Sequence, residues 1–214
     1  MRKWKIFCLV LCLAGTLVGC ISSKFGTEDK KEEVHKNQYK SEVDKDQDGI
    51  DDQTDILQNA KEYIARKPKY ESKYYQGGYP NDGYGVCTDV VGYALKNAGY
   101  DLQVLVDKDI RSHLSEYRMD KPDDKIDFRR VSNLKVYFKH TAKSLTLDVN
   151  KTEEWQPGDI VVWETHIGIV ADQWNEDGVP YVIHHYSKRQ KNYTQDILEN
   201  TQRFGGLIGH YRIS

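Results

Sequence analysis

The spacing of apolar residues predicts helices in the first two thirds of this 214-residue chain. Apolar residues recur every three or four positions over 54–66 and again over 87–97, which is the period of a helix with one buried face. Pro68 marks the end of the first helix, and Gly99 caps the second. Weaker helical patterns lie further along, at 110–117 and 133–142. The intervening segments 70–86 and 119–130 are expected to be loops.

The last third of the chain changes to a strand pattern. Short apolar runs rich in Val and Ile are separated by turn residues such as Gln-Pro-Gly and Asn-Glu-Asp-Gly. The expected strands cover 160–163, 166–170, 181–184 and 206–212. Helices followed by an antiparallel sheet predict an α+β domain over 54–214, with N-terminal helices packed on a C-terminal antiparallel sheet.

The N-terminus has the parts of a secretory signal. Arg2, Lys3 and Lys5 precede a short apolar run over 6–18, which is too short to span a bilayer comfortably. The run ends at Cys20 in a sequence that resembles a bacterial lipobox, which implies removal of residues 1–19 and lipidation of the Cys20 thiol. The expected location is the extracytoplasmic face of the cell membrane, by a lipid anchor. An ordinary signal peptide that contains a cysteine is the alternative.

Charge and composition limit the partners of the mature chain. Loss of the leader with its three basic residues would take the formal net charge from −2 to −5. No basic block remains, so nucleic-acid binding is not expected. Residues 20–43 are polar with few apolar anchors, which predicts a flexible spacer that begins at the lipidated cysteine.

The segment 44–55 carries carboxylates at the spacing of a calcium loop. Side chains stand at loop positions 1, 3, 5, 9 and 12, glycine stands at position 6, and position 7 offers a backbone carbonyl. The predicted ligands are Asp44, Asp46, Asp48, Ile50, Asp52 and Asp55. The segment resembles the calcium loops of dockerins and thrombospondin-type repeats, which implies a structural Ca²⁺. A solvated acidic hinge is the alternative.

Cys87 is the thiol expected to stay free in the mature chain. Cys8 and Cys12 lie in the predicted leader, and Cys20 is the predicted lipidation site. Cys87 begins the helix predicted over 87–97, and a helix N-terminus or a neighbouring imidazole lowers the pKa of a thiol. These features are typical of a nucleophile, although a single cysteine is also a common small core residue.

Two histidines at strand-like positions complete a candidate triad. His166 precedes a strand with small and apolar residues, and His184 ends the next apolar run, so that His184 could orient the His166 ring. On an ideal strand only one of His184 and His185 can face this site. A zinc site made of cysteine and the two histidines is a further alternative, but the short paired spacings of structural zinc sites are missing.

Three segments, in the same order, resemble the NlpC-type cell-wall cysteine peptidases. Residues 74–89 (YYQGGYPNDGYGVCTD) resemble their nucleophile segment, 157–170 resemble their Pro-Gly-Asp and His-x-Gly strands, and 182–184 resemble the strand with the third triad member. The whole stretch 44–214 also resembles an uncharacterised bacterial family of this papain-like clan. At the nucleophile the chain has Val-Cys-Thr-Asp where the NlpC type has Asp-Cys-Ser-Gly.

The resemblance implies a papain-like fold and a set of roles. Cys87 would be the nucleophile, His166 the general base and acid, and His184 the orienting residue, with Tyr74 and Thr88 at the oxyanion and substrate side. The implied activity is that of a cysteine peptidase or amidase on amide bonds of peptidoglycan peptides, without a catalytic cofactor. A non-catalytic, calcium-stiffened binding module and a cysteine-dependent acyltransferase remain as alternatives.

Overall fold

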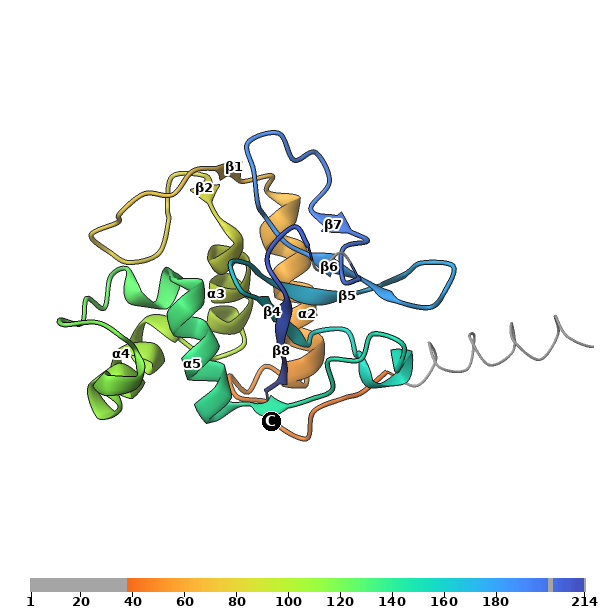
Figure 1. Cartoon of the computed structure of the whole chain (residues 1–214), viewed down its shortest axis with the longest axis horizontal. Helices are drawn as coiled ribbons and strands as arrows, with labels where there is room; N and C mark the ends of the chain where they lie inside the picture. The colour runs from red at the N-terminus through yellow and green to blue at the C-terminus, as the bar shows by residue number, and fades with distance from the viewer. Residues whose placement is uncertain (1–37, 200–201, 214) are drawn as a thin grey trace, which may run out of the picture. The chain divides into compact units, whose positions relative to one another are not determined.

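Helices and one antiparallel sheet make up an α+β domain in this computed structural model, which describes residues 38–199 and 202–213 (Figure 1). The four α-helices of the described part are α2 (Asp52–Ala65), α3 (Cys87–Asn97), α4 (Leu102–Ser112) and α5 (Val131–Thr141). Three 3₁₀ turns connect the rest: η1 (Leu114–Glu116), η2 (Asp127–Arg129) and η3 (Thr152–Glu154). None of the described helices has the length and apolar character needed to cross a membrane.

The main sheet has the strand order β3-β8-β4-β5-β6-β7, and every neighbouring pair is antiparallel. Its strands are β3 (Lys143–Ser144), β4 (Ile160–Trp163), β5 (Ile167–Trp174), β6 (Pro180–Ile183), β7 (Thr194–Gln195) and β8 (Leu207–Arg212). A separate parallel pair, β1 (Lys69–Tyr70) and β2 (Tyr84–Gly85), brackets the loop before α3. The prediction of helices followed by an antiparallel sheet is confirmed.

Apolar side chains of the strands are shared between two buried clusters, because successive residues of a strand point to opposite faces. Ile167 and Ile169 of β5 belong to the cluster formed with α2, α3, α4 and α5. Val170 belongs to the other cluster, together with Trp163, Phe204 and apolar residues of the loops on that side. In Figure 1, α2 and α3 lie side by side against the sheet, consistent with their packing against β5.

The Pro-Gly-Asp turn before β4 is a structural joint. Gly158 has φ +92°, and a Cβ there would lie 2.4 Å from the Gln53 carbonyl oxygen, so only glycine fits without distortion. The buried Asp159 carboxylate accepts hydrogen bonds from Arg212 (2.7 Å), His210 (2.9 Å) and Gln53 (3.0 Å). Asp159 therefore ties β4 to β8 and to α2, which explains this part of the sequence pattern without catalysis.

Two sequence-based boundaries in the helical half were wrong. The helix expected at 110–117 lies instead over Leu102–Ser112, with the 3₁₀ turn η1 after it, because the Asp101 carboxylate caps its start by accepting the Gln103 N–H. The expected polar loop at 119–130 contains η2, whose residues are buried, with Phe128 in the helical cluster. The charged residues around Phe128 gave this segment no apolar pattern from which a buried turn could be predicted.

The domain also begins earlier than the acidic segment. Ser41 is buried and donates its N–H to Asp51, the Val43 carbonyl accepts the N–H of Asp52, and the Arg212 guanidinium lies over the Tyr39 ring. Residues 38–43 thus belong to the folded domain rather than to the predicted spacer. The predicted leader, the lipidation site Cys20 and the spacer up to residue 37 lie outside the described residues.

Candidate active site

Cys87 is the first residue of α3, as the sequence predicted. Val86 precedes it with extended backbone, and the Asp89 carboxylate reaches back to accept the Val86 N–H at 2.8 Å. This contact closes the first turn of the helix and fixes the direction in which the Cys87 side chain leaves it. Cys87 as a residue keeps some exposed surface, while its thiol group is surrounded by protein atoms.

A buried ion pair holds this helix start in place. The Arg129 guanidinium donates to both oxygens of Asp89, at 2.6 Å and 3.0 Å, and both side chains are almost fully buried. Arg129 also donates to the Lys73 carbonyl at 2.7 Å. The pair therefore connects α3, η2 and the loop between β1 and β2.

The thiol of Cys87 rests in its protonated form. Burial raises the pKa of Cys87 to about 12, and the nearby Asp89 carboxylate adds to the rise. The backbone N–H groups of Ile167, Thr88 and Cys87 act in the opposite direction by facing the sulfur, as expected at a helix N-terminus. The expected lowering of the thiol pKa is therefore wrong for this resting structure, because desolvation outweighs the donated N–H groups.

His166, His184 and Gln195 form a chain of hydrogen bonds across the ends of three strands. The Nε2 atom of His166 lies 2.8 Å from Nδ1 of His184, and Nε2 of His184 lies 3.0 Å from Oε1 of Gln195. An amide oxygen only accepts, so His184 must carry its proton on Nε2. His184 Nδ1 then accepts from His166, which leaves Nδ1 of His166 unprotonated and able to take a proton.

Both rings of this relay are buried and neutral. Burial lowers the pKa of His166 to about 3, and proximity to His184 lowers it further. Burial likewise lowers the pKa of His184 to about 4, against the opposing effect of the Gln195 hydrogen bond. The His166 ring stacks on Phe204 with centroids 4.1 Å apart, and His184 stacks on Tyr186 at 5.2 Å. The two rings are therefore fixed in orientation by packing as well as by hydrogen bonds.

The start of β5 lies against the thiol of Cys87. The Cys87 sulfur faces the backbone N–H of Ile167, the residue that directly follows His166. Within residues 38–199 and 202–213, no hydrogen bond joins the Cys87 thiol to the His166 imidazole. Nδ1 of His166 is not among the buried side-chain atoms without a hydrogen-bond partner. In the absence of substrate such contacts are often long and tighten only in the reacting complex.

Comparison with known proteins places the chain in a family. The family described as "Domain of unknown function (DUF1287)" matches residues 57–213. The chain belongs to this family. It is also 35% identical over 170 residues to "Uncharacterized protein YijF" of Escherichia coli (strain K12), an alignment that covers 73% of this chain and 80% of the relative. No solved structure matches.

The family match spans the histidine relay and the nucleophile but begins after the acidic segment. Cys87, His166, His184 and Gln195 all fall within residues 57–213, whereas 44–55 precede them. The acidic segment 44–55 is therefore not part of the stretch that the family model matches. Gln195 was missed by sequence reasoning, because it lies in a two-residue strand after a polar loop and carries no local signal.

Two residues expected at the oxyanion side do not serve there through their side chains. Tyr74 is half exposed, and its hydroxyl donates to the Asp123 carboxylate at 3.2 Å. Thr88 is buried and donates its hydroxyl to the Arg129 carbonyl at 3.1 Å, so only its backbone N–H faces the sulfur. Tyr70 is nearer to the thiol: burial raises the pKa of Tyr70, and charge on the Cys87 sulfur raises it further.

Tyr70 also connects the thiol to a surface cavity. The ring of Tyr70 meets the His185 ring edge-on with centroids 5.1 Å apart, and both residues line a cavity of about 390 Å³. His185 thus points away from the relay, which settles which of the two adjacent histidines joins His166. The rest of the cavity wall mixes lysines, tyrosines and one glutamate: Lys67, Pro68, Lys69, Glu71, Tyr84, Ser187, Lys188, Gln190 and Tyr193.

The acidic segment folds as a tight loop that gathers three of its predicted ligands. Oxygens of Asp44, Asp46 and Asp48 lie within 4.8 Å of one another, and Asp44 accepts the N–H groups of Asp48 and Gly49. Gly49 has φ +94°, a conformation that favours glycine. The loop therefore has the compact form that a bound cation requires.

The two remaining carboxylates behave differently. Asp55 is buried, its Oδ2 atom has no partner, and burial beside the charges of Asp46, Asp48 and Asp52 raises its pKa to about 6. Each oxygen of Asp52 accepts one hydrogen bond, from the Lys45 N–H at 2.7 Å and from the Tyr100 hydroxyl. Its assignment as a ligand stays a prediction.

Proposed function

We propose that the protein is a cysteine peptidase or amidase that cleaves amide bonds in peptidoglycan peptides, with Cys87 as nucleophile, His166 as base and acid, and His184 as orienting residue. The observation that carries the proposal is the His166–His184–Gln195 relay beside a helix-terminal thiol. The relay leaves a free lone pair on His166. The resemblance of the same segments to the NlpC-type peptidases, and thus to a papain-like fold, supports it.

The neutral resting pair determines the order of the proton transfers. His166 Nδ1 takes the thiol proton as the sulfur attacks the amide carbonyl, and the new imidazolium donates through Nε2 to His184. Backbone N–H groups at the start of α3 stabilise the oxyanion. His166 then protonates the leaving amine, which departs and leaves the acyl group on Cys87 as a thioester. A water molecule that gives a proton to the same nitrogen hydrolyses this thioester, and the thiol is regenerated when His166 returns the proton.

The cavity next to Tyr70 suits a peptide with carboxylate groups. Lys67, Lys69 and Lys188 line this cavity together with Tyr70 and His185. Cell-wall peptides carry free carboxylates that such a wall would attract. A lipid on Cys20 would hold the domain at the extracytoplasmic membrane face, next to this polymer, so that modest intrinsic affinity is sufficient.

Purified peptidoglycan tests the proposal directly. The protein and its Cys87→Ala variant are each incubated with the polymer, and released fragments are identified by mass spectrometry. We expect new amine and carboxyl ends with the unmodified protein and none with Cys87→Ala. Equal fragments from both would remove Cys87 as nucleophile. Products that carry an added amine acceptor in place of water would assign the site to acyl transfer instead.

The adjacent histidines provide a matched control for the relay. His184→Phe removes the acceptor for His166, whereas His185→Phe keeps an aromatic ring between Tyr70 and Tyr193. We expect His184→Phe to lower kcat by about 100-fold or more, in the range of general acid–base effects, while His185→Phe retains kcat. A loss of kcat confined to His185→Phe would overturn the assignment of His184.

We also propose a structural Ca²⁺ in the loop 44–55, held by the predicted ligands Asp44, Asp46, Asp48, Ile50, Asp52 and Asp55. The unpartnered oxygen of buried Asp55 supports it, because buried polar atoms normally have a partner and a cation would supply one. Calcium would relieve the repulsion among these carboxylates and fix the start of α2. The site lies outside the catalytic residues, so its role is to stabilise the domain.

Calorimetry and thermal unfolding test the calcium proposal. Titration with CaCl₂ should give one site, and the unfolding temperature should rise with calcium and fall again with EGTA. Asp48→Asn should weaken binding, whereas Asp82→Asn, on an exposed loop outside the segment, should not. The absence of both the binding heat and the thermal shift would end the proposal.

A further inference from the structure

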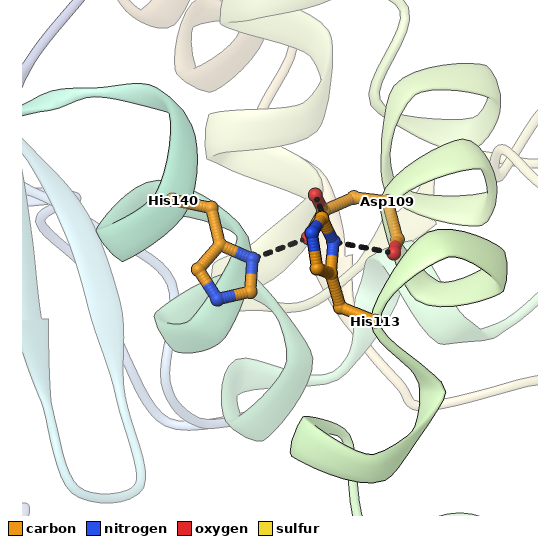
Figure 2. A group of neighbouring side chains, drawn as sticks. All are labelled: Asp109, His113 and His140. Atoms are coloured by element: carbon orange, nitrogen blue, oxygen red, sulfur yellow. Dashed lines mark hydrogen bonds and ion pairs between the residues drawn. The ribbon is translucent and has the colours of Figure 1, made fainter.

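A second group of metal-ligating side chains lies on the helical side of the domain, away from the proposed active site. Asp109 and His113 stand four residues apart at the end of α4, and His140 stands near the end of α5 (Figure 2). Residues at this spacing share one helix face. One ligand atom from each of the three side chains lies within 4.8 Å of the other two.

The two imidazoles converge on one carboxylate. Nδ1 of His113 lies 3.1 Å from Oδ1 of Asp109, and Nδ1 of His140 lies 2.7 Å from Oδ2 of the same side chain. The ring centroids of the two histidines are 4.9 Å apart. Figure 2 shows a nitrogen of the His140 ring joined to the Asp109 carboxylate, with the His113 ring beside the same residue. A small movement of the rings would bring all three groups onto one ion, at the metal–ligand distances of about 2.0–2.2 Å that zinc requires.

Partners outside the three ligands orient them as in a metal site. Glu116 lies 3.1 Å from Nε2 of His140 and accepts its N–H, so that Nδ1, which donates to Asp109, becomes a ligand once a cation displaces its proton. The Tyr117 hydroxyl donates to Asp109. Histidine ligands of metals usually donate their second N–H to a carboxylate in this way, and ligating carboxylates are themselves hydrogen-bonded. The neighbours of the cluster therefore hold its ligands in suitable orientation.

We propose that Asp109, His113 and His140 bind one divalent transition metal ion, Zn²⁺ in the first instance. Two imidazoles and one carboxylate suit zinc, whereas Ca²⁺ and Mg²⁺ prefer sites made of oxygen ligands. Three protein ligands leave a fourth position for water. Asp109 and His140 are half-buried and His113 is exposed, so an ion can enter from solvent. The bound metal would clamp α4 to α5.

The test is titration of the tag-free Cys87→Ala variant with ZnCl₂ in calcium-containing buffer. This variant removes the other thiol-and-imidazole cluster as a source of zinc binding. We expect one-to-one binding by calorimetry, a higher unfolding temperature with zinc that EDTA reverses with calcium kept in excess, and the visible absorption of tetrahedral coordination when Co²⁺ replaces Zn²⁺. MgCl₂ should give no binding heat.

Variants in the same background locate the ion. His113→Ala and His140→Ala should each weaken zinc binding by at least about 100-fold, and Tyr117→Phe by roughly 10-fold, as for the outer partners of other metal sites. The unfolding temperature in EDTA identifies a variant that has merely failed to fold. His185→Phe, a histidine outside the cluster, should bind zinc normally. No one-to-one binding, or binding unchanged in both His113→Ala and His140→Ala, would overturn the proposal.

Discussion

At the scale of single residues, the direction in which a side chain points decides its chemistry more than its type. His184 and His185 are neighbours in sequence, yet one joins the relay to His166 and the other meets Tyr70 beside the cavity. The sequence pointed to Tyr74, but its hydroxyl donates to Asp123, whereas Tyr70 is near enough to Cys87 for charge on the sulfur to add to the burial that raises the pKa of Tyr70. Residue type limits the possible chemistry, and local geometry selects among the candidates.

The reactivity of Cys87 follows from its surroundings. Because burial raises the pKa of Cys87 to about 12, very little thiolate is present at pH 7. We expect the native protein to react with iodoacetamide far more slowly at pH 7 than the unfolded chain, whose thiol has a pKa of about 8.5. The rate should keep rising up to pH 10. A plateau below pH 7 would instead indicate a preformed thiolate–imidazolium pair.

At the scale of elements, close backbone approach at β5 and β6 explains the glycine two residues after His166. A Cβ on Gly168 would lie 2.5 Å from Val182 Cγ1 and 2.8 Å from the Ile183 carbonyl oxygen. Gly168→Ala should therefore lower the free energy of unfolding by about 1–3 kcal/mol and disturb the His166–His184 contact. Chemical denaturation measures the first effect and peptidoglycan cleavage the second.

Gly77→Ala is the matched control for this substitution. A Cβ on Gly77 would meet no atom within 4 Å, and its backbone is not in the left-handed region. We expect a change in the free energy of unfolding within about 0.5 kcal/mol, as for other surface substitutions. Equal destabilisation by both alanines would show that loss of glycine itself, rather than crowding between β5 and β6, is responsible.

The Asp89–Arg129 pair joins three segments and should matter more than any surface pair. Asp89→Asn leaves the Arg129 guanidinium buried without a counter-ion, which should cost about 3–5 kcal/mol of stability. Lys61→Ala breaks the partly exposed pair with Asp172 and should cost at most about 1 kcal/mol. Urea unfolding of the two variants checks this difference, and similar losses would contradict it.

At the scale of the whole molecule, buried neutral histidines link stability to pH. The pKa of His166 is lowered to about 3, and those of His184 and His185 to about 4, in each case mainly by burial. The unfolded chain, with histidine pKa values near 6.5, therefore binds more protons than the native protein once the pH falls below about 6.5. The contribution of these neutral histidines to the free energy of unfolding is complete above that pH and is lost as the pH falls toward 4.

Acid unfolding should show this dependence. Each histidine contributes up to about 1.4 kcal/mol per pH unit, so the free energy of unfolding should decrease by several kcal/mol between pH 6.5 and pH 4. His185→Phe removes one of the three groups while it keeps the ring contacts with Tyr70 and Tyr193. The variant should have a shallower pH dependence in the same denaturant series. An identical dependence would show that His185 does not take part.

The sequence by itself determined the order of elements and the candidate chemistry. Apolar period predicted α2, α3, α5 and the central strands close to their observed bounds, because these elements bury one face against the core. Cys87 at a helix start followed directly from the same pattern. The two-residue strands and η2 were missed, because they are held by distant partners such as Asp89 and carry little local signal.

Only the tertiary structure decided which residues meet. Three features join segments far apart along the chain or depend on side-chain direction: the relay through Gln195, the unpartnered oxygen of Asp55 and the Asp109–His113–His140 cluster. The protonated resting thiol was likewise beyond the sequence. A helix N-terminus favours the thiolate, but the depth of burial, which only packing sets, outweighs it.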